Sequence, residues 1–372
     1  MQILYLSASY VPSRRASSIQ VMKMCQALAR NGHQVTLVTK ECASRQEPGI
    51  LDDFSFYGVE PNFEIIKLPR PEHRGGGVLY TYGQWQLLRQ WVQKRDALLV
   101  YSRDLWGGWL AVRQGFSVVF EAHGMPDGDL SQRLMRQMIN SATFRRLVVI
   151  SQALADDFAQ IGLWPADGDV VVAHDGAEGG VQASGRGEAN GRVQIGYVGH
   201  LYSGKGMEMV TALAGQMSDQ PFHVIGGTDK DIRTWQASGL PANVTLHGFV
   251  SPPQLAVCYQ NLDILLLPPQ PQVYGATGSQ DISRWMSPMK LFEYMAAGKA
   301  IVSSDLPVLR EVLTHERNAL LVAPDDVKGW VTAVTRLIND PDLRQRLGQT
   351  ARQDLLAHYT WEARAHKVLD GL

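Results

Sequence analysis

The sequence has few cysteines, little net charge and no long hydrophobic run, and each shortage excludes a class of protein. Its three cysteines, Cys25, Cys42 and Cys258, lie far apart and form no C-x-x-C pair, so we expect neither a disulfide framework nor a zinc site. A formal net charge of −1 at pH 7 argues against a nucleic-acid partner. No apolar run approaches the roughly 18 residues of a membrane span, and residues 1–10 have the pattern of a strand rather than of a cleavable signal. We therefore expect a cytoplasmic protein.

Apolar residues, in contrast, are abundant and make up 45% of the 372 residues. A chain of this length and composition can bury two large cores, so two domains are expected. Through the first half, short runs rich in Val, Ile and Leu alternate with amphipathic stretches, which favours a parallel sheet covered by helices on both faces. The first domain, residues 1–178, has predicted strands at 3–9, 34–40, 63–69, 97–103, 117–123, 147–151 and 170–176.

The same alternation restarts after a polar, glycine-rich stretch at residues 179–192, which has the composition of a surface linker. The second domain, residues 193–355, has predicted strands at 193–199, 222–227, 244–250, 264–270, 299–305 and 319–324. The expected fold class is therefore α/β, with two Rossmann-like, doubly wound parallel sheets that face each other across a cleft.

The stretch with the most local detail is SRWMSPMKLFEYMAAGKAIVSSDLPVLREVL, residues 283–313. Ser287 and Pro288 have the pattern of a helix N-cap and a first helical residue. Lys290 and Glu293 are three residues apart, so they share one face of this helix near its start. The strand that follows puts these charges near the carboxyl edge of a sheet, where open parallel sheets bind ligands. From the spacing alone, a solvated ion pair on an ordinary helix is the simpler explanation.

This stretch resembles the donor-site segment of the fourth glycosyltransferase family (glycosyl transferases group 1), whose members are retaining enzymes with the two-domain GT-B fold. The resemblance implies that Glu293 binds the ribose of a sugar nucleotide and that Ser287 and Lys290 also belong to the donor site. Many members carry a second glutamate near the donor sugar, eight residues earlier, where this chain has Trp285. Asp281 is the nearest upstream carboxylate. Which group holds the donor sugar is therefore open.

Residues 199–205 match the phosphate-loop spacing G-x-x-x-x-G-K, but Gly206 follows where a nucleoside triphosphatase has the serine or threonine that holds magnesium. An anion site is still indicated, because glycines let backbone amides approach a phosphate and Lys205 adds a cation at a helix start. The loop also resembles the family's diphosphate loop, which implies that Gly199 and Lys205 contact the leaving diphosphate. Many members have one more arginine in this loop, and Lys290 is the expected substitute.

The family also places the nucleobase against the backbone that follows the strand at 244–250, which implies that Phe249 and Val250 bind the donor. His247 is open between stacking on the base and a buried structural role. The glycine- and proline-rich loop at residues 268–285 is expected to close over the donor, because long loops in compact domains are commonly functional.

In the first domain, the loop after the first strand contains Ser17 and Ser18, either of which can cap the helix that follows. By resemblance, this loop lies on the acceptor side. Family members often have two glycines here, which would let the backbone approach the substrate. Helix capping and acceptor binding therefore both remain open for the two serines. The apolar face of the predicted helix consists of Val21, Met24, Cys25 and Leu28.

His123 ends the predicted strand at 117–123, and from the residues alone a structural role is the more common outcome for such a histidine. The resemblance instead implies contact with the donor sugar. Glu121, one residue off the inward phase of the strand, is expected to pair with a nearby arginine.

The helical stretch at residues 80–95 carries Trp85 and Trp91 beside Arg89 and Arg95. Core packing is the simplest explanation of the tryptophans. The alternative is contact with a lipid-linked acceptor or with the inner face of the cell membrane, since aromatic and basic residues together suit a headgroup interface.

We therefore expect a retaining glycosyltransferase that moves a sugar from a nucleoside-diphosphate sugar to a hydroxyl of a glycan or lipid-linked acceptor. His123, Lys205 and Lys290 are the expected catalytic residues, with no cofactor and no metal. The alternatives are a sugar-nucleotide epimerase or phosphorylase of the same architecture, or a non-catalytic sugar-nucleotide-binding protein. In the family, the terminal helix, residues 356–372, crosses back onto the first domain.

Overall fold

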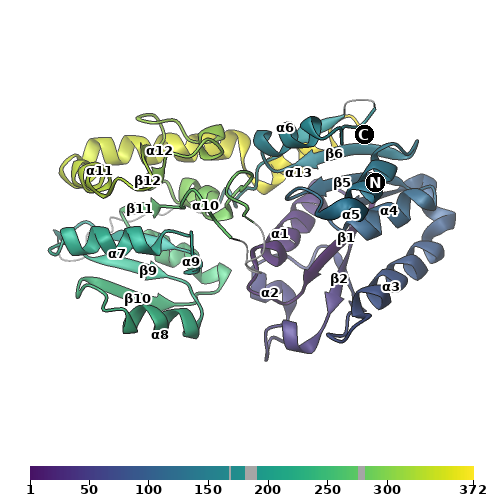
Figure 1. The fold of residues 1–372 in the computed structure, drawn as a ribbon, viewed down its shortest axis with the longest axis horizontal. Coiled ribbons are helices and arrows are strands. Elements are labelled where there is room, and N and C mark those ends of the chain that lie inside the picture. The colour runs from purple at the N-terminus through teal and green to yellow at the C-terminus, as the bar shows by residue number, and fades with distance from the viewer. Residues whose placement is uncertain (167–168, 181–190, 275–280) are drawn as a thin grey trace. The chain divides into compact units, whose positions relative to one another are not determined.

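The chain forms two compact units, described here from a computed structural model (Figure 1). The structure describes residues 1–166, 169–180, 191–274 and 281–372, without the side chains of residues 95 and 96. The first unit consists of Met1–His174 and Trp361–Leu372, and the second of Asp175–Thr360. Most of the predicted linker and part of the predicted loop at 268–285 lie outside the described residues.

The first unit is built on a seven-stranded sheet in the order β3-β2-β1-β4-β5-β6-β7, and every neighbouring pair of strands is parallel. All seven predicted strands are present. Their alternating order about β1 is that of a doubly wound, Rossmann-like sheet. The strands are β1 (Gln2–Tyr10), β2 (Gln34–Glu41), β3 (Glu64–Pro69), β4 (Leu98–Ser102), β5 (Ser117–Ala122), β6 (Phe144–Val149) and β7 (Val170–Val172).

Helices connect these strands, as parallel pairing requires. They are α1 (Ala16–Arg30), α2 (Asp53–Tyr57), α3 (Gly76–Trp91), α4 (Leu105–Arg113), α5 (Gly128–Ile139) and α6 (Gln152–Gln160). The predicted apolar face of α1 is fully buried. The predicted serine cap is wrong, because α1 begins at Ala16 after Arg15, and the hydroxyl of Ser18 instead donates a hydrogen bond to the carbonyl of Tyr10 at 2.8 Å.

The terminal helix α13 (Trp361–Leu369) belongs to the first unit and packs against α1. Trp361 is buried there. At the exposed end of the contact, Arg30 donates to the Glu362 carboxylate at 2.6 Å, and Asn31 donates to the Glu362 carbonyl at 3.1 Å. The preceding helix, α12, ends at His358 in the second unit, so the chain passes between units at Trp361.

The second unit is built on a six-stranded parallel sheet in the order β10-β9-β8-β11-β12-β13, and all six predicted strands are present. Two apolar clusters cover its faces, one with α9 and α10 and the other with α7, α8 and α11. The strands are β8 (Ile195–Val198), β9 (Phe222–Ile225), β10 (Val244–Gly248), β11 (Ile264–Leu267), β12 (Ala300–Ser304) and β13 (Leu320–Val322). The helices are α7 (Met207–Gln216), α8 (Asp229–Ala237), α9 (Pro252–Gln260), α10 (Met289–Ala297), α11 (Val327–Asn339) and α12 (Pro341–His358).

Across the described residues, none of these helices combines the length and the apolar character that crossing a bilayer requires.

Candidate active site

The loop between β8 and α7 is held against the backbone that follows β11. Gly206 occupies the N-cap position of α7 with φ of 95°. A Cβ atom there would lie 2.0 Å from the carbonyl oxygen of Pro268, and one on Gly204 would lie 2.3 Å from that of Gln272. Only glycine fits such contacts at positive φ. These glycines therefore fix the loop on its neighbour and bring Lys205, which lies between them, to the carboxyl edge of the sheet.

Lys290 reaches the same edge from the first turn of α10. Its Nζ atom is buried, has no hydrogen-bond partner among the described residues, and lies 4.2 Å from the centroid of the Tyr197 ring. Lys205 lies over Tyr202, with its Nζ atom 5.6 Å from the ring centroid. β8 and β11, which lead into the two lysine-bearing segments, are adjacent parallel strands. The fold thus brings together two cations that are 85 positions apart in the sequence.

The electrostatics of this lysine pair favour an anion. Burial lowers the pKa of Lys205 to about 8. Burial and the charge of Lys205 together hold the pKa of Lys290 well below its usual value, against the opposing effect of Glu293. Burial, together with the charges of the same two lysines, lowers the pKa of His200 to about 4. An unpaired buried cation is costly, and a bound anion would remove that cost.

Glu293 lies one turn further along α10 and accepts a hydrogen bond from the Tyr259 hydroxyl at 2.8 Å. α10 begins at Met289, with Pro288 in the N-cap position, so the predicted cap at Ser287 is wrong. The buried Ser287 hydroxyl instead accepts a hydrogen bond from the backbone N–H of Asp175 at 2.8 Å. No local pattern indicates this partner, which is 112 residues away.

The residues expected at the nucleobase follow β10. Phe249 is exposed, and Val250 packs against the apolar cluster of α9 and α10. His247 is exposed as well and lies 3.0 Å from the ring nitrogen of His223, so the buried structural role considered for it is wrong.

Asp281, the nearest carboxylate upstream of Trp285, is engaged with its own loop. Its Oδ1 atom accepts backbone N–H groups from Val273 at 3.0 Å and from Ser283 at 2.9 Å. Burial raises the pKa of Asp281, but these donors outweigh that effect and leave the pKa below its ordinary value. The Asp281 carboxylate thus stabilises the conformation of its own loop.

In the first unit, His123 follows β5 and is oriented by Glu121. The histidine Nε2 atom lies 2.5 Å from Oε1 of the fully buried Glu121. The Glu121 carboxylate also accepts hydrogen bonds from Gln20 at 2.9 Å and from the Tyr101 hydroxyl. Arg364 of α13 contacts both carboxylate oxygens at 3.1 Å. Glu121 therefore holds His123 by one ring nitrogen at the carboxyl edge of the first sheet.

The arginine partner expected for Glu121 is thus present, although it comes from the other end of the chain. Burial raises the pKa of Glu121, but Arg364, His123 and Arg103 outweigh burial and keep the pKa well below the usual value. Arg364, Arg103 and Tyr101 were not predicted. The signal that could have indicated them is a glutamate inside an apolar strand, since a buried carboxylate needs charged or hydrogen-bonding partners.

Ser17 and Ser18 lie in the first turn of α1, which follows β1 at the same edge of the first sheet. Ser18 is fully buried and bonded to Tyr10, so its hydroxyl supports the loop. Ser17 is half-buried, and its carbonyl lies 3.5 Å from the Arg103 guanidinium. The structure thus brings the first turn of α1, Arg103 and the Glu121–His123 pair into one hydrogen-bonded group.

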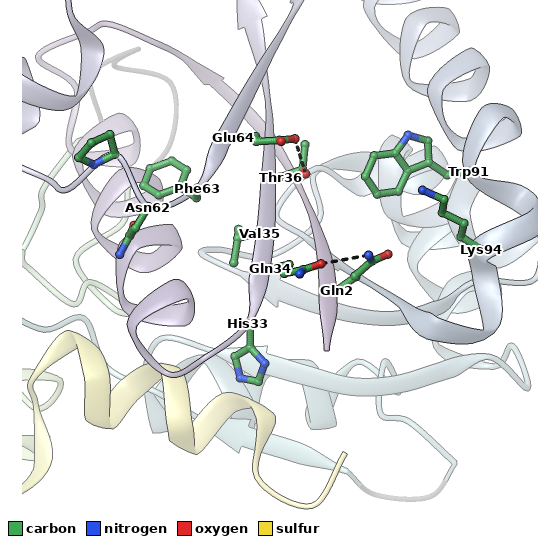
Figure 2. A pocket seen from close by; sticks show the side chains of 11 residues that line it. Gln2, His33, Gln34, Val35, Thr36, Asn62, Phe63, Glu64, Trp91 and Lys94 are labelled. Atoms are coloured by element: carbon green, nitrogen blue, oxygen red, sulfur yellow. Dashed lines mark hydrogen bonds between the residues drawn. The ribbon is translucent and has the colours of Figure 1, made fainter.

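A separate pocket of about 650 Å³ lies at the amino edge of the first sheet (Figure 2). Its polar side chains bond to one another: Gln2 donates to Gln34 at 3.1 Å, and Thr36 donates to Glu64 at 3.4 Å. Trp91 lines this pocket and is half-buried, so the expectation that it packs in the core is only partly met. Ligand crevices of open parallel sheets lie at the carboxyl edge, and none of the predicted site residues lines this pocket.

Two Rossmann-like units, the second with a half-buried lysine pair at its carboxyl edge, define a GT-B type of protein. The family model "Glycosyl transferase 4-like domain" matches residues 16–176, and "Glycosyl transferases group 1" matches residues 192–340. The chain therefore belongs to the group 1 glycosyltransferases. The matches cover both domains, which agrees with the resemblance found in the sequence.

Several characterised and uncharacterised proteins are similar in sequence. An uncharacterised glycosyltransferase of Methanocaldococcus jannaschii is 23% identical over 60% of this chain and 59% of its own length. Phosphatidyl-myo-inositol mannosyltransferase of Mycolicibacterium smegmatis is 28% identical over 44% of this chain and 40% of its own length. GDP-mannose-dependent alpha-mannosyltransferase of the same organism is 25% identical over 97% of this chain and 94% of its own length.

Solved structures share the fold at low identity. Sucrose-phosphate synthase from Thermosynechococcus elongatus has a TM-score of 0.68 at 19% identity and covers 98% of this chain and 96% of its own. HepE from Anabaena, in complex with UDP and glucose, has a TM-score of 0.71 at 15% identity, with each chain fully covered.

Proposed function

We propose that this protein is a retaining glycosyltransferase that uses a nucleoside-diphosphate sugar as donor. The observation that carries the proposal is the pair of half-buried lysines, Lys205 and Lys290, since the Nζ atom of Lys290 is buried and has no hydrogen-bond partner among the described residues. Two cations on a glycine-fixed loop and a helix start suit a diphosphate. Support also comes from the M. smegmatis relative whose name states dependence on GDP-mannose, and from HepE bound to UDP and glucose.

In this proposal, each predicted donor residue has one role. Lys205, Lys290 and the backbone of Gly199 bind the diphosphate. Glu293 binds the ribose, with Tyr259 fixing its carboxylate. The backbone at Phe249 and Val250 contacts the base, while Ser287 ties the start of α10 to the backbone of Asp175.

The reaction breaks the bond between the anomeric carbon and the diphosphate oxygen and forms a bond from that carbon to an acceptor hydroxyl oxygen. The hydroxyl proton passes to the departing phosphate, and the new bond forms on the face that the phosphate leaves. Lysine charges fixed beforehand stabilise the developing negative charge of the diphosphate. His123, held by Glu121, contacts the donor sugar. Glu121 has both oxygens bound by Arg364, Tyr101, Gln20 and His123, so we assign it a positioning role and no nucleophilic one.

A glycan or lipid-linked acceptor fits the proposal, because relatives carry names from lipopolysaccharide core and O-antigen biosynthesis. We propose that the lysines make a metal ion unnecessary and that the protein works in the cytoplasm at the inner face of the membrane.

The test is thermal stabilisation by UDP, GDP and ADP in the presence of EDTA. A ligand at 100 times its Kd stabilises the folded state by about 2.7 kcal/mol, so one of the nucleotides should raise the melting temperature by several degrees. Lys290→Met should lose that shift, whereas Lys94→Met, at the amino-edge pocket, should keep it. If no nucleotide stabilises the wild type, or if Lys290→Met retains the full shift, the donor site is assigned incorrectly.

A further inference from the structure

A second pocket of the first unit, of about 560 Å³, lies at the carboxyl edge of the sheet. Lys40 comes from the end of β2, Arg70 follows β3, and Asp104 follows β4. Helices α3 and α4, which pack on each other, complete its walls. β4 pairs with β5, whose end carries His123, so this pocket opens at the edge of the sheet where His123 lies.

Two cations line the pocket. The Nζ atom of Lys40 lies 5.2 Å from the ring centroid of Tyr80 and 5.9 Å from that of Tyr10, and burial lowers its pKa. The Nε atom of Arg70 is buried and has no hydrogen-bond partner among the described residues. The two charges are close enough for Arg70 to lower the pKa of Lys40 further.

The carboxylates that face these cations are already engaged. Asp104 raises the pKa of Lys40, but its Oδ2 atom accepts the backbone N–H of Gly107 and caps α4. Glu72 lies near Arg70 but forms an ion pair with Arg45 at 2.7 Å. The pocket thus keeps an excess of positive charge, which suits a bound anion.

Several of the other residues that line the pocket are aromatic. Tyr82 is 49% exposed and stacks on Trp85 with the ring centroids 5.5 Å apart. Trp106 of α4 is 40% exposed. Trp85 therefore lines a pocket rather than the core. Exposed rings of this size provide broad apolar surfaces with fixed geometry, on which the apolar faces of a sugar ring can pack.

We propose that this pocket binds the acceptor and selects one that carries an anionic group, a phosphate or a carboxylate, on or next to its sugar. Lys40 and Arg70 hold the anion, and Tyr82, Trp85 and Trp106 contact the sugar. The inference rests on the proposed transferase function, because that function requires a second substrate besides the donor. It extends that function by naming the class of acceptor and two residues that determine specificity.

The experiment is calorimetric titration of the full chain, with the nucleotide that stabilises the wild type (UDP, GDP or ADP) present at saturation so that the diphosphate site is occupied. Mannose 6-phosphate is compared with mannose, and methyl glucuronide with methyl glucoside, so that each anionic sugar has its own neutral counterpart. The anionic sugars should bind at least tenfold more tightly, because hydrogen bonds between charged groups contribute more than neutral ones. Lys40→Met and Arg70→Met should each lower the ratio of anionic to neutral sugar affinity by about tenfold.

Lys94→Met is the matched control, since it removes one positive charge from the amino-edge pocket of the same unit (Figure 2). Lys94→Met should change the affinity for the anionic sugars less than twofold. Lys40→Arg keeps the positive charge, so it should retain most of the preference for anionic sugars that Lys40→Met loses. Equal binding of neutral and anionic sugars would overturn the proposal, and so would an unchanged preference in both methionine variants. Binding only to phosphatidylglycerol vesicles, with none of the soluble sugars, would overturn it in favour of a headgroup surface.

Failure of this inference can be told from failure of the proposed function by the stabilisation that UDP, GDP or ADP gives the wild type. A nucleotide-dependent shift without discrimination between sugars leaves the transferase proposal intact and removes only the anionic acceptor. Unaltered stabilisation by UDP in Lys40→Met shows, in turn, that this variant is folded.

Discussion

At the scale of single residues, the proposed donor site depends on charges that the free protein holds at a cost. Lys205 and Lys290 are both buried enough for their pKa values to fall, and Lys205 lowers that of Lys290. A bound diphosphate would reverse both shifts, because an opposite charge nearby favours the protonated amine. Binding of the nucleotide is therefore linked to protonation of the lysines.

The affinity for the nucleotide that stabilises the wild type, taken below as UDP, should therefore depend on pH. Below pH 8, Lys205 is already protonated in the free protein, so its contribution to the affinity for UDP is present. As pH rises through 8, Lys205 loses its proton in the free protein, and binding of UDP must then include proton uptake by this lysine. From this pKa, we expect about a tenfold weaker affinity at pH 9 than at pH 7. Calorimetry in two buffers of different ionisation enthalpy would measure the proton uptake directly.

Lys205→Arg is the control for this prediction, because arginine stays charged throughout this range. The variant should show a weaker dependence on pH, with the remainder due to Lys290. An identical pH profile in the wild type and in Lys205→Arg would contradict the assignment.

The sequence marked both lysines as candidate site residues, but it could not show how Lys290 is held. Its position over Tyr197 depends on packing between β8 and α10, which lie nearly a hundred residues apart. For the same reason, the cap expected at Ser287 was wrong, because its hydroxyl bonds to a backbone group 112 residues away. Capping by Ser17 or Ser18, one of the two roles left open for these serines, is also not what the structure shows, since Ser18 bonds to the carbonyl of Tyr10 and α1 begins after Arg15.

At the scale of elements, strands were easier to predict than the ends of helices. All thirteen predicted strands are present because runs of apolar residues of strand length, covered on both faces, leave few alternatives. The glycine loop before α7 was also recognised from its spacing. What its glycines do became clear only from the structure, since Gly204 and Gly206 fit against the carbonyls of Gln272 and Pro268.

Gly206→Ala should therefore damage this loop. The added Cβ atom would lie 2.0 Å from the Pro268 carbonyl oxygen at φ of 95°, so the loop must move away from the segment after β11. We expect a loss of stability of at least about 1–3 kcal/mol, together with a much weaker affinity for UDP. Urea unfolding and nucleotide titration would measure the two effects.

Gly215→Ala, on the same helix, is the matched control. The nearest atom to its Cβ would be 4.0 Å away, and this position lies within α7. Replacing a helical glycine by alanine there should stabilise the protein by about 0.5–1 kcal/mol and leave the affinity for UDP unchanged. If both variants behaved alike, the packing of the loop would not account for its glycines.

At the scale of the whole molecule, the last helix completes the first unit. Arg364 donates to Glu121, 243 residues earlier in the chain, and to the carbonyls of Ala173 and His174. No sequence pattern indicated this arginine, because a contact of such separation leaves no local periodicity. The buried carboxylate that it neutralises is the one that orients His123, so α13 supports the candidate site of the first unit as well as its stability.

Arg364→Met should therefore destabilise the first unit strongly. Removal of one partner of a buried ion pair leaves Glu121 charged and poorly compensated, at a cost of about 3–5 kcal/mol. Arg30→Met removes a more exposed link to the same helix, through Glu362, and should cost less than about 1 kcal/mol. Urea unfolding followed by tryptophan fluorescence would compare the two variants.

The same contact predicts how stability responds to acid. The pKa of Glu121 is lower in the folded protein than its unfolded value near 4.5, so its stabilising contribution is present above pH 4.5 and is lost as pH falls towards the folded pKa. Arg364→Met weakens the cause of that shift, so the loss of stability between pH 5 and pH 3 should be smaller in the variant than in the wild type. Stabilisation by UDP at pH 7 should persist in Arg364→Met, because Lys205 and Lys290 belong to the other unit. If Arg364→Met were as stable as Arg30→Met, the Glu121 carboxylate would be neutralised without α13. The helix would then stabilise neither the first unit nor the orientation of His123.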